Sequence, residues 1–262
     1  MNFTAKLESK TRQRAADRGV LRAAMIPHNV SDAIFTHDWD IAEQWFRLVG
    51  PDRVNDRHHD GTPALVSLCC TSIDEGCVRL ARFLIDQGAD VHLCSNEPNY
   101  GGGVENGLTP LHYAARGNSG PDDGEDNPHQ LELISVLLAA GANVNATCPV
   151  WDSTPLSMAL LHLSRYFRPK VVSALLRAGA SLDSFHGGHP ATGEPAQSVE
   201  EYLRSIEEEY RGEGHLYPWQ ELTDNASYAA CKAIIAGVRA EGSWKAYARR
   251  CAGITKGASL EA

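Results

Sequence analysis

The sequence has few of the features that identify membrane proteins and the common classes of enzyme. Its 262 residues contain no G-x-x-x-x-G-K, G-x-S-x-G or H-E-x-x-H motif. The longest apolar runs, such as residues 136–140, are far shorter than the roughly 20 residues of a membrane-spanning helix. We therefore expect no enzyme activity, no cofactor and no membrane partner.

Cysteine is present, but in no pattern that indicates disulfides or a zinc site. The seven cysteines form an odd number and include no C-x-x-C pair, which favours reduced thiols in a cytosol or nucleus. The first residues also lack the continuous apolar stretch of a secretory signal. These observations predict a cytoplasmic or nuclear protein.

Positive charge is scarce in much of the chain, whose net charge is −9. Residues 1–22 hold six basic and two acidic side chains, so they carry +4 and the remainder carries −13. A net-negative body argues against a protein that coats nucleic acid, which needs a basic stripe. We expect the basic arm, residues 1–30, to be partly disordered. A solvated helix, a partner-binding tail and a targeting segment all fit its composition.

One stretch in the middle of the chain carries a recognisable repeat signature. Residues 106–115 read N-G-L-T-P-L-H-Y-A-A. The glycine permits a left-handed turn, Thr109 can cap a helix, and Pro110 suits the first helical turn. Residues 137–145 read L-L-A-A-G-A-N-V-N, an apolar helix end stopped by glycine. Together the two stretches resemble the opening and closing motifs of the ankyrin repeat.

The resemblance implies an all-α ankyrin-repeat solenoid of helix-turn-helix units with β-hairpin fingers. Two further repeats share the pattern, with T-P dipeptides at Thr62 and Thr154 and closing glycines at Gly88 and Gly179. All three repeats are longer than the family pattern. We expect repeats one and three to add about one turn to the first helix, and repeat two to add an acidic loop within residues 117–126.

The flanking segments are expected to close the two ends of the repeat array. Residues 31–60 resemble a capping half-repeat whose first half is an irregular helix, and residues 61–185 hold the three repeats. Residues 186–252 are expected to form a degenerate fourth repeat and a helical C-terminal cap, which covers the open end of the last repeat. Residues 253–262 are expected to be a flexible tail.

The resemblance also implies where a partner would bind. Ankyrin repeats commonly bind proteins on a concave face made of finger tips and first helices. In this sequence those positions are Arg57, His58, His59, Tyr100, Glu105, Asn106, Leu108, Arg116, Val150, Trp151 and His162. Trp151 has no core position in the repeat pattern, and an exposed Trp beside Tyr and Arg is typical of an interface hot spot. The alternative is that Trp151 folds back onto the neighbouring finger.

Several other candidate residues are better explained by structure than by chemistry. His112 occupies the histidine position of the repeat motif, which implies hydrogen bonds within the fold rather than catalysis. The pairs His58–His59 and His186–His189 lack the cysteines or carboxylates that would complete a zinc site, so no metal is expected. Cys69 and Cys70 are expected to be small helix residues rather than nucleophiles.

These observations predict a non-catalytic protein-interaction module, a scaffold or adaptor, whose partner is a protein of unknown identity. Two alternatives stay open. The C-terminal helical segment could make the essential contact, as in a regulatory or targeting subunit. A ligand or an active site could instead lie between the long finger, residues 96–103, and Trp151. Asn145 also resembles the asparagine that hydroxylases modify in ankyrin repeats.

Overall fold

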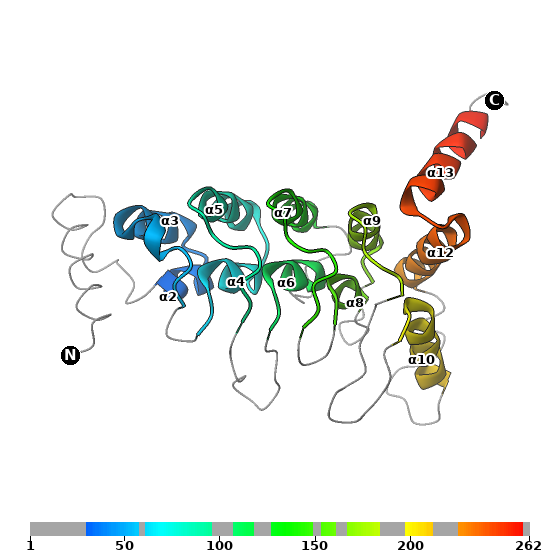
Figure 1. Ribbon diagram of the computed structural model, residues 1–262, viewed down its shortest axis with the longest axis horizontal. Helices are drawn as coiled ribbons and strands as arrows, with labels where there is room; N and C mark the ends of the chain where they lie inside the picture. Colours follow the sequence, from blue (N-terminus) through cyan, green and yellow to red (C-terminus); the bar gives the residue numbers. More distant parts are fainter. Residues whose placement is uncertain are drawn as a thin grey trace. The chain divides into compact units, whose positions relative to one another are not determined.

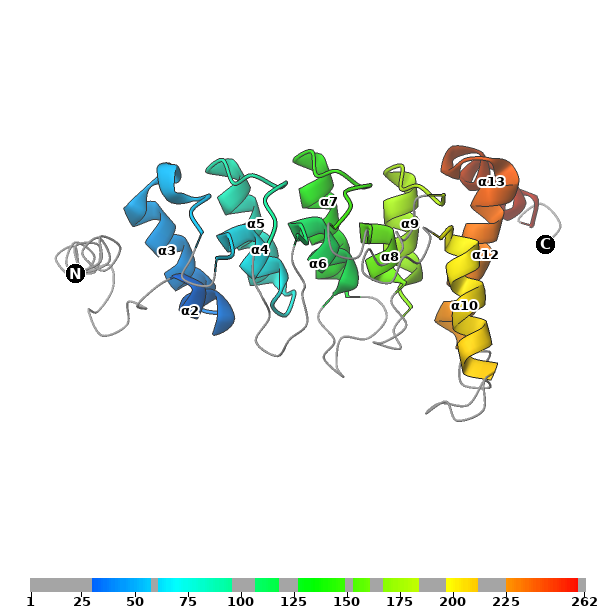
Figure 2. The ribbon, with the colours of Figure 1, turned by 60° about the horizontal axis from the view of Figure 1, so that its bottom comes forward.

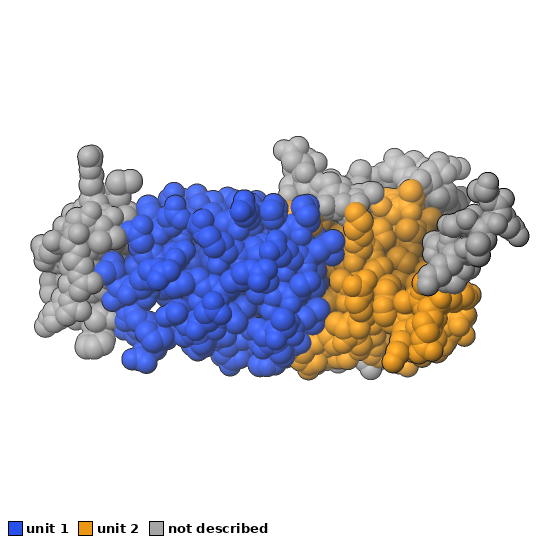
Figure 3. Space-filling view, turned by 90° about the horizontal axis from the view of Figure 1, so that it is seen from above, with its two compact units in different colours: residues 1–120, 128–142 blue, residues 121–127, 143–262 orange. Residues whose placement is uncertain are grey.

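The computed structural model describes most of the predicted helical segments and few of the predicted loops. The described residues are 30–57, 61–95, 107–117, 127–148, 153–160, 167–183, 197–211 and 225–258. Apart from one isolated bridge, their regular structure is helical, which confirms the predicted all-α class (Figure 1). The chain divides into two compact units, one of residues 1–120 and 128–142, the other of residues 121–127 and 143–262 (Figure 3).

The described part of unit 1 consists of helix pairs and one short 3-10 helix. The pairs are α2 (Val30–Phe35) with α3 (Trp39–Val49), α4 (Ala64–Cys69) with α5 (Glu75–Asp86), and α6 (Pro110–Arg116) with α7 (Pro128–Ala139); the 3-10 helix η2 spans Pro51–Arg53. The first helices contact one another in the order α2, α4, α6, and the second helices in the order α3, α5, α7. Unit 1 is therefore a two-layered stack of helical hairpins (Figure 2).

Apolar side chains at helical spacing hold the two layers of unit 1 together. In α5, Leu80 and Leu84 are fully buried, and in α7 so are Leu133 and Leu137. Each pair is four residues apart, which places both leucines on one face of its helix. Burying one such side chain stabilises the fold by about 1.5–3 kcal/mol. The second helices thus supply much of the core beneath the first helices.

The T-P motif starts α6 as the sequence predicts. The Thr109 backbone N–H donates to Nδ1 of His112 at 3.2 Å, and the Thr109 hydroxyl lies 2.8 Å from the same nitrogen. Pro110 is the first helical residue, where a missing N–H leaves no helical hydrogen bond unmade. His112 is 0% exposed. The predicted structural role of His112 is confirmed, because its ring belongs to the helix cap.

Each repeat closes on a glycine in the left-handed conformation. Gly88, Gly141 and Gly179 have φ values of 91°, 92° and 96°. The N–H of the residue after each glycine donates to a leucine carbonyl in the last helical turn, at 2.9 Å in repeat one and 3.0 Å in the other two. This is the Schellman arrangement, which favours glycine because a Cβ would crowd the backbone.

Two asparagines link one closing turn to the next. In unit 1, Asn55 Nδ2 donates to the Gly88 carbonyl at 2.9 Å, and Asn55 Oδ1 accepts from the Asp90 N–H at 2.8 Å. In unit 2, Asn145 makes the same two bonds to the turn at Gly179, at 3.1 and 2.8 Å. The segment that ends at Asn55 therefore acts as a closing motif of the cap.

The N-terminal cap is a complete helix pair, which corrects the expectation of a half-repeat with an irregular first helix. α2 ends at Phe35 and α3 begins at Trp39. Between them His37 has a positive φ of 61°, and the Asp38 N–H donates to the Ala33 carbonyl at 2.8 Å. The turn closes like a helix C-terminus without using glycine, so the sequence carried no turn signal there.

The first helix of repeat one is short, whereas the sequence predicted an additional turn. α4 ends at Cys69, and the added residues form the loop before α5. In this loop Thr71 and Ile73 are 4% and 5% exposed, and the Thr71 hydroxyl donates to the Leu68 carbonyl at 2.8 Å. The apolar residues of the loop are buried without being helical. The corresponding residues of repeat three, 161–166, lie outside the described residues.

Helices of the C-terminal segment cover the last repeat in unit 2. The described helices of unit 2 are α8 (Pro155–Ala159), α9 (Pro169–Arg177), α10 (Val199–Arg211), α12 (Ala226–Glu241) and α13 (Trp244–Ala258). α8 and α9 contact each other as a repeat pair, and both α12 and α13 contact α9. The predicted helical C-terminal cap is therefore present.

α10 and α13 each begin at a capping serine, and α13 is longer than expected. The Ser198 N–H donates to Glu201 Oε2 at 2.7 Å, and the Glu201 N–H donates to Ser198 Oγ at 3.3 Å, which is a capping box. Ser243 caps α13 by accepting a backbone N–H at 3.3 Å. α13 continues to Ala258, so residues 253–258 are helical rather than part of a flexible tail. No proline interrupts the run after Ser243.

Candidate functional site

Most of the predicted partner-binding residues belong to finger tips, which lie outside the described residues. The structure describes Arg57, Leu108 and Arg116, all in unit 1. The predicted positions outside the described residues are His58, His59, Tyr100, Glu105, Asn106, Val150, Trp151 and His162. The acidic loop and the tip of the long finger, residues 118–126 and 96–106, are also outside them.

Arg57 holds the bases of the first two fingers together. Its Nη1 donates to the Gly61 carbonyl at 2.7 Å and to the Cys94 carbonyl at 2.9 Å. Gly61 belongs to the first finger and Cys94 to the second. The side chain is exposed, so it both orders the fingers and presents a cation at their base.

Leu108 is part of the core, which corrects its assignment to the partner-binding surface. Its side chain is 2% exposed. The Leu108 carbonyl accepts from the Ser95 N–H at 3.1 Å, and the Gly107 N–H donates to the Ser95 carbonyl at 2.9 Å. This pair of bonds closes the base of the second finger. The finger turns the Leu108 side chain inward, against the helices.

Arg116 and Tyr113 lie on the same side of α6. They are three residues apart, which places them one helical turn from each other, and both are half-buried. The Tyr113 hydroxyl donates to Ser95 Oγ at 3.3 Å, which joins α6 to the base of the second finger. The sequence analysis missed Tyr113. Its signal was its place in T-P-L-H-Y-A-A, the one position within the motif that the repeat pattern leaves variable.

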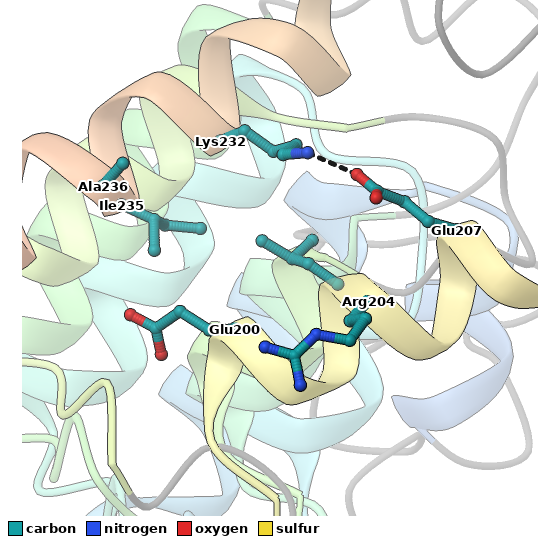
Figure 4. Close-up of a pocket in the computed structure, with 7 residues that line it drawn as sticks. Glu200, Arg204, Glu207, Lys232, Ile235 and Ala236 are labelled. Atoms are coloured by element: carbon teal, nitrogen blue, oxygen red, sulfur yellow. Dashed lines mark hydrogen bonds and ion pairs between the residues drawn. The ribbon is translucent and has the colours of Figure 1, made fainter.

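A small hollow lies between α10 and α12 of unit 2 (Figure 4). Its volume is about 210 Å³, and its lining consists of Glu200, Leu203, Arg204, Glu207, Lys232, Ile235 and Ala236. Hydrogen bonds and ion pairs between side chains lie at both ends of the hollow. At one end the Arg239 guanidinium donates to both oxygens of Glu200, at 2.7 and 2.9 Å. At the other, the Tyr228 hydroxyl donates to Glu207 at 2.8 Å, and Lys232 also pairs with Glu207.

These contacts keep the two carboxylates ionised. Hydrogen bonding from Arg239 lowers the pKa of Glu200 below its ordinary value. Burial raises the pKa of Glu207, but hydrogen bonds from Lys232 and Tyr228 outweigh it and leave the pKa lowered. Burial and the neighbouring Glu207 raise the pKa of Tyr228, so the phenol stays protonated. The groups that line this hollow are paired for stability rather than arranged for proton transfer.

A second, more polar hollow lies at the turn between α2 and α3 in unit 1. Its volume is about 440 Å³, and it is lined by His37, Asp38, Trp39, Asp40, Ile41, Gly76 and Arg79. The Trp39 ring stacks on His37 at 5.0 Å between centroids, and its Nε1 donates to Asp74 at 3.1 Å. The indole is 9% exposed. The ring is therefore a packing element rather than an open binding face.

Two buried cysteines of repeat one, Cys69 and Cys77, are poor nucleophiles. Cys69 and Cys77 are buried at 2% and 0% exposed. Burial raises the pKa of the Cys69 thiol well above its ordinary value and that of Cys77 to about 12. A thiol with a raised pKa carries little reactive thiolate at neutral pH. Both residues act as small core side chains, in agreement with the prediction for Cys69.

In the described ranges, no three His, Cys, Asp or Glu side chains come together as a metal site would require. The histidine pairs considered for metal binding, His58–His59 and His186–His189, fall outside those ranges. None of the described helices combines the length and the apolarity that crossing a bilayer requires.

Comparison with known proteins identifies the repeat. The family model described as "Ankyrin repeat" matches residues 106–149. No curated protein matches the sequence. Among solved structures, the crystal structure of the human ASB11 ankyrin repeat domain is similar at 19% sequence identity, with a TM-score of 0.44. That similarity covers 70% of this chain and 72% of that chain.

Proposed function

Because this chain is an ankyrin-repeat protein, a class of module that generally binds other proteins, we propose that it is a non-catalytic scaffold or adaptor. It would bind one protein partner on the surface made by its first helices and finger bases. The observation that carries this proposal is that side-chain hydrogen bonds join neighbouring parts of that surface in unit 1. Arg57 joins the first finger to the second, and Tyr113 joins the second finger to α6.

A surface ordered in this way favours binding because little conformational entropy is lost on association. The finger bases are fixed by backbone hydrogen bonds at 2.9 and 3.1 Å. Beneath them, α4 and α6 present fully buried leucines, Leu68 and Leu111, to the core. The layer therefore cannot shift without disrupting packing. A partner would meet a preformed surface with Arg57, Tyr113 and Arg116 on it.

The proposal is tested by affinity purification of the wild-type chain from its native host, followed by quantitative mass spectrometry. Substituting Arg116→Ala together with Trp151→Ala should reduce at least one retained protein by about tenfold, as loss of a hot-spot side chain does. The matched control is Arg82→Ala, since Arg82 lies on the second-helix layer and pairs with Glu132 at 2.8 Å. Equal retention by the double variant and the wild type would count against binding on this face.

The second candidate is a regulatory or targeting subunit that binds through its C-terminal helices. It is favoured by α13, which packs on α12 and α9 and continues as a helix to Ala258 (Figure 1). Deleting residues 244–262 separates the two candidates. Under the first, the deletion variant keeps its partner; under the second, it stays folded by circular dichroism but loses the partner.

We also infer a reducing compartment, the cytoplasm or the nucleus, from the cysteines. The seven cysteines form an odd number and include no C-x-x-C pair, and Cys69 and Cys77 are buried as thiols. This pattern favours reduced cysteines over a disulfide framework. Subcellular fractionation tests this inference.

A further inference from the structure

The C-terminal helices carry a positive charge that the rest of the protein does not share. Residues 226–258 hold six Lys or Arg and one acidic residue, Glu241, a net charge of +5. The whole chain carries −9, so the remaining residues carry −14. α13 itself has four basic residues and no acidic one. The charge of this helix is opposite to that of the molecule it belongs to.

Two described cations of α13 share one face of the helix. Lys245 and Arg249 are four residues apart, so they fall within about 40° of each other around the helix axis and lie about 6 Å apart along it. The side chains of Lys245 and Arg249 are exposed. We call Lys245 and Arg249 the basic stripe. Arg250 lies off this face and pairs with Glu241 at 3.2 Å.

The cations of the basic stripe differ from most of those described elsewhere in the protein. Basic side chains on other helices pair with carboxylates, as Arg47 does with Glu43 and Arg239 with Glu200. Among the described residues, neither Lys245 nor Arg249 has a carboxylate within ion-pair distance. Exposed cations without internal partners are available to a charged partner, and attraction between opposite charges favours its approach.

The opposite face of α13 is already occupied. Tyr247 packs against Gly237 of α12 so closely that a Cβ on Gly237 would lie 2.3 Å from the Tyr247 ring. The Arg177 guanidinium of α9 lies 5.8 Å from the centre of the Trp244 ring. These contacts hold the first turns of α13 on α12 and α9, and they hold the basic stripe on the side that faces away.

We propose that the basic stripe of α13 is a docking surface for an acidic segment of a protein partner. A helix that lies on a membrane buries an apolar face in the lipid, and the aromatic side chains of α13 are used against α9 and α12. Single-stranded nucleic acid is commonly bound by exposed aromatic rings beside cations, whereas Tyr247, the aromatic residue between Lys245 and Arg249, packs against Gly237 of α12. Charge complementarity alone favours a carboxylate-rich protein segment.

The proposal is tested on the full chain by fluorescence anisotropy with a labelled glutamate-rich peptide. A peptide of about 12 residues is long enough to place several carboxylates near both cations. It should bind the wild-type protein at about 50 mM salt and weaken as salt screens the charges. The same peptide with Gln in place of Glu should not bind. The variant Lys245→Glu with Arg249→Glu should bind the glutamate peptide about tenfold more weakly.

Two controls locate the effect on α13. Arg204→Glu with Arg211→Glu makes the same change of charge on α10 and should bind as the wild type does. Arg12→Gln, Arg14→Gln, Arg18→Gln and Arg22→Gln together neutralise most of the basic N-terminal arm, and this variant should also bind. The thermal midpoint of each variant confirms that it is folded.

Three results would overturn the proposal. The first is equal peptide binding by the α13 variant and the wild type, and the second is loss of binding in the arm variant. The third is tighter binding of the wild type to phosphatidylserine vesicles or to duplex DNA than to the glutamate peptide. None of these results involves the finger surface of unit 1. The proposal that a protein partner binds that surface is therefore tested independently.

Discussion

At the scale of single residues, the chain uses histidine and asparagine as structural connectors. His112 caps the helix in which it lies, and Asn55 and Asn145 each tie one closing turn to the next. Asn145 could be recognised from its motif. Asn55 was harder to recognise, because η2 inserts an additional residue between the closing Gly50 and the asparagine. Its role follows from the two hydrogen bonds rather than from its spacing.

Replacing His112 is expected to destabilise unit 1. His112→Ala removes the cap acceptor of α6 and leaves a cavity at a fully buried position, so we predict a loss of about 2 kcal/mol or more in the free energy of unfolding. His112→Gln keeps an acceptor at the position that Glu or Gln holds in a capping box, and it should lose less. Urea denaturation measures both. Equal losses in the two variants would show that the cap is unimportant.

At the scale of helices, the sequence predicted where a helix begins better than where it ends. The T-P motif and the serine caps mark starts because they satisfy backbone N–H groups locally, with side chains a few residues away. Helix ends without glycine gave no comparable signal. His37 closes α2 with a positive φ, and α4 stops at Cys69 where buried loop residues take over. In both places tertiary packing decides the boundary.

The contact between α12 and α13 predicts an unusual response to alanine. Within an exposed helix, Gly→Ala stabilises by about 1 kcal/mol. At Gly237 the new Cβ would meet the Tyr247 ring at 2.3 Å, and overpacking of this kind costs about 1–3 kcal/mol. We therefore predict that Gly237→Ala lowers the thermal midpoint. It should also speed hydrogen exchange in α13. A raised midpoint would mean that α13 does not pack on α12 as described.

The ion pair between α10 and α12 predicts a dependence of stability on pH. Because hydrogen bonding from Arg239 lowers the pKa of Glu200 in the folded protein, the carboxylate stabilises the fold above its unfolded pKa of about 4.3. That contribution is lost as the pH falls through the folded-state pKa. Glu200→Gln should therefore lower the thermal midpoint at pH about 7 and have a smaller effect at pH about 3. An effect of the same size at both pH values would exclude the ion pair as its cause.

At the scale of the whole molecule, the repeat scaffold was predictable, and the side chains on the proposed binding surface were predictable only in part. The scaffold follows from local motifs that recur along the chain, since each repeat packs mainly on its neighbours. The surface depends on which side chains the fingers turn outward. The structure places Leu108 in the core, and Tyr113, at a variable position of the motif, lies on the same side of α6 as Arg116.

Charge distribution was also predicted only in part. The basic N-terminal arm was evident from composition, whereas the basic stripe of α13 was not. The sequence did not show which face of α13 packs on α9 and α12, and this packing leaves Lys245 and Arg249 exposed. Both ends of the chain thus carry charge opposite to that of the repeats.

The central claim, that a protein partner binds the first helices and finger bases of unit 1, is tested most directly by site-specific photo-cross-linking in the native host. Benzoylphenylalanine at Tyr113 keeps an aromatic side chain on the proposed surface, and the same probe at Arg82 samples the second-helix layer. A discrete protein adduct from position 113 and none from position 82 is the result that we predict. Adducts from position 82 alone, or the same adducts from both positions, would contradict it.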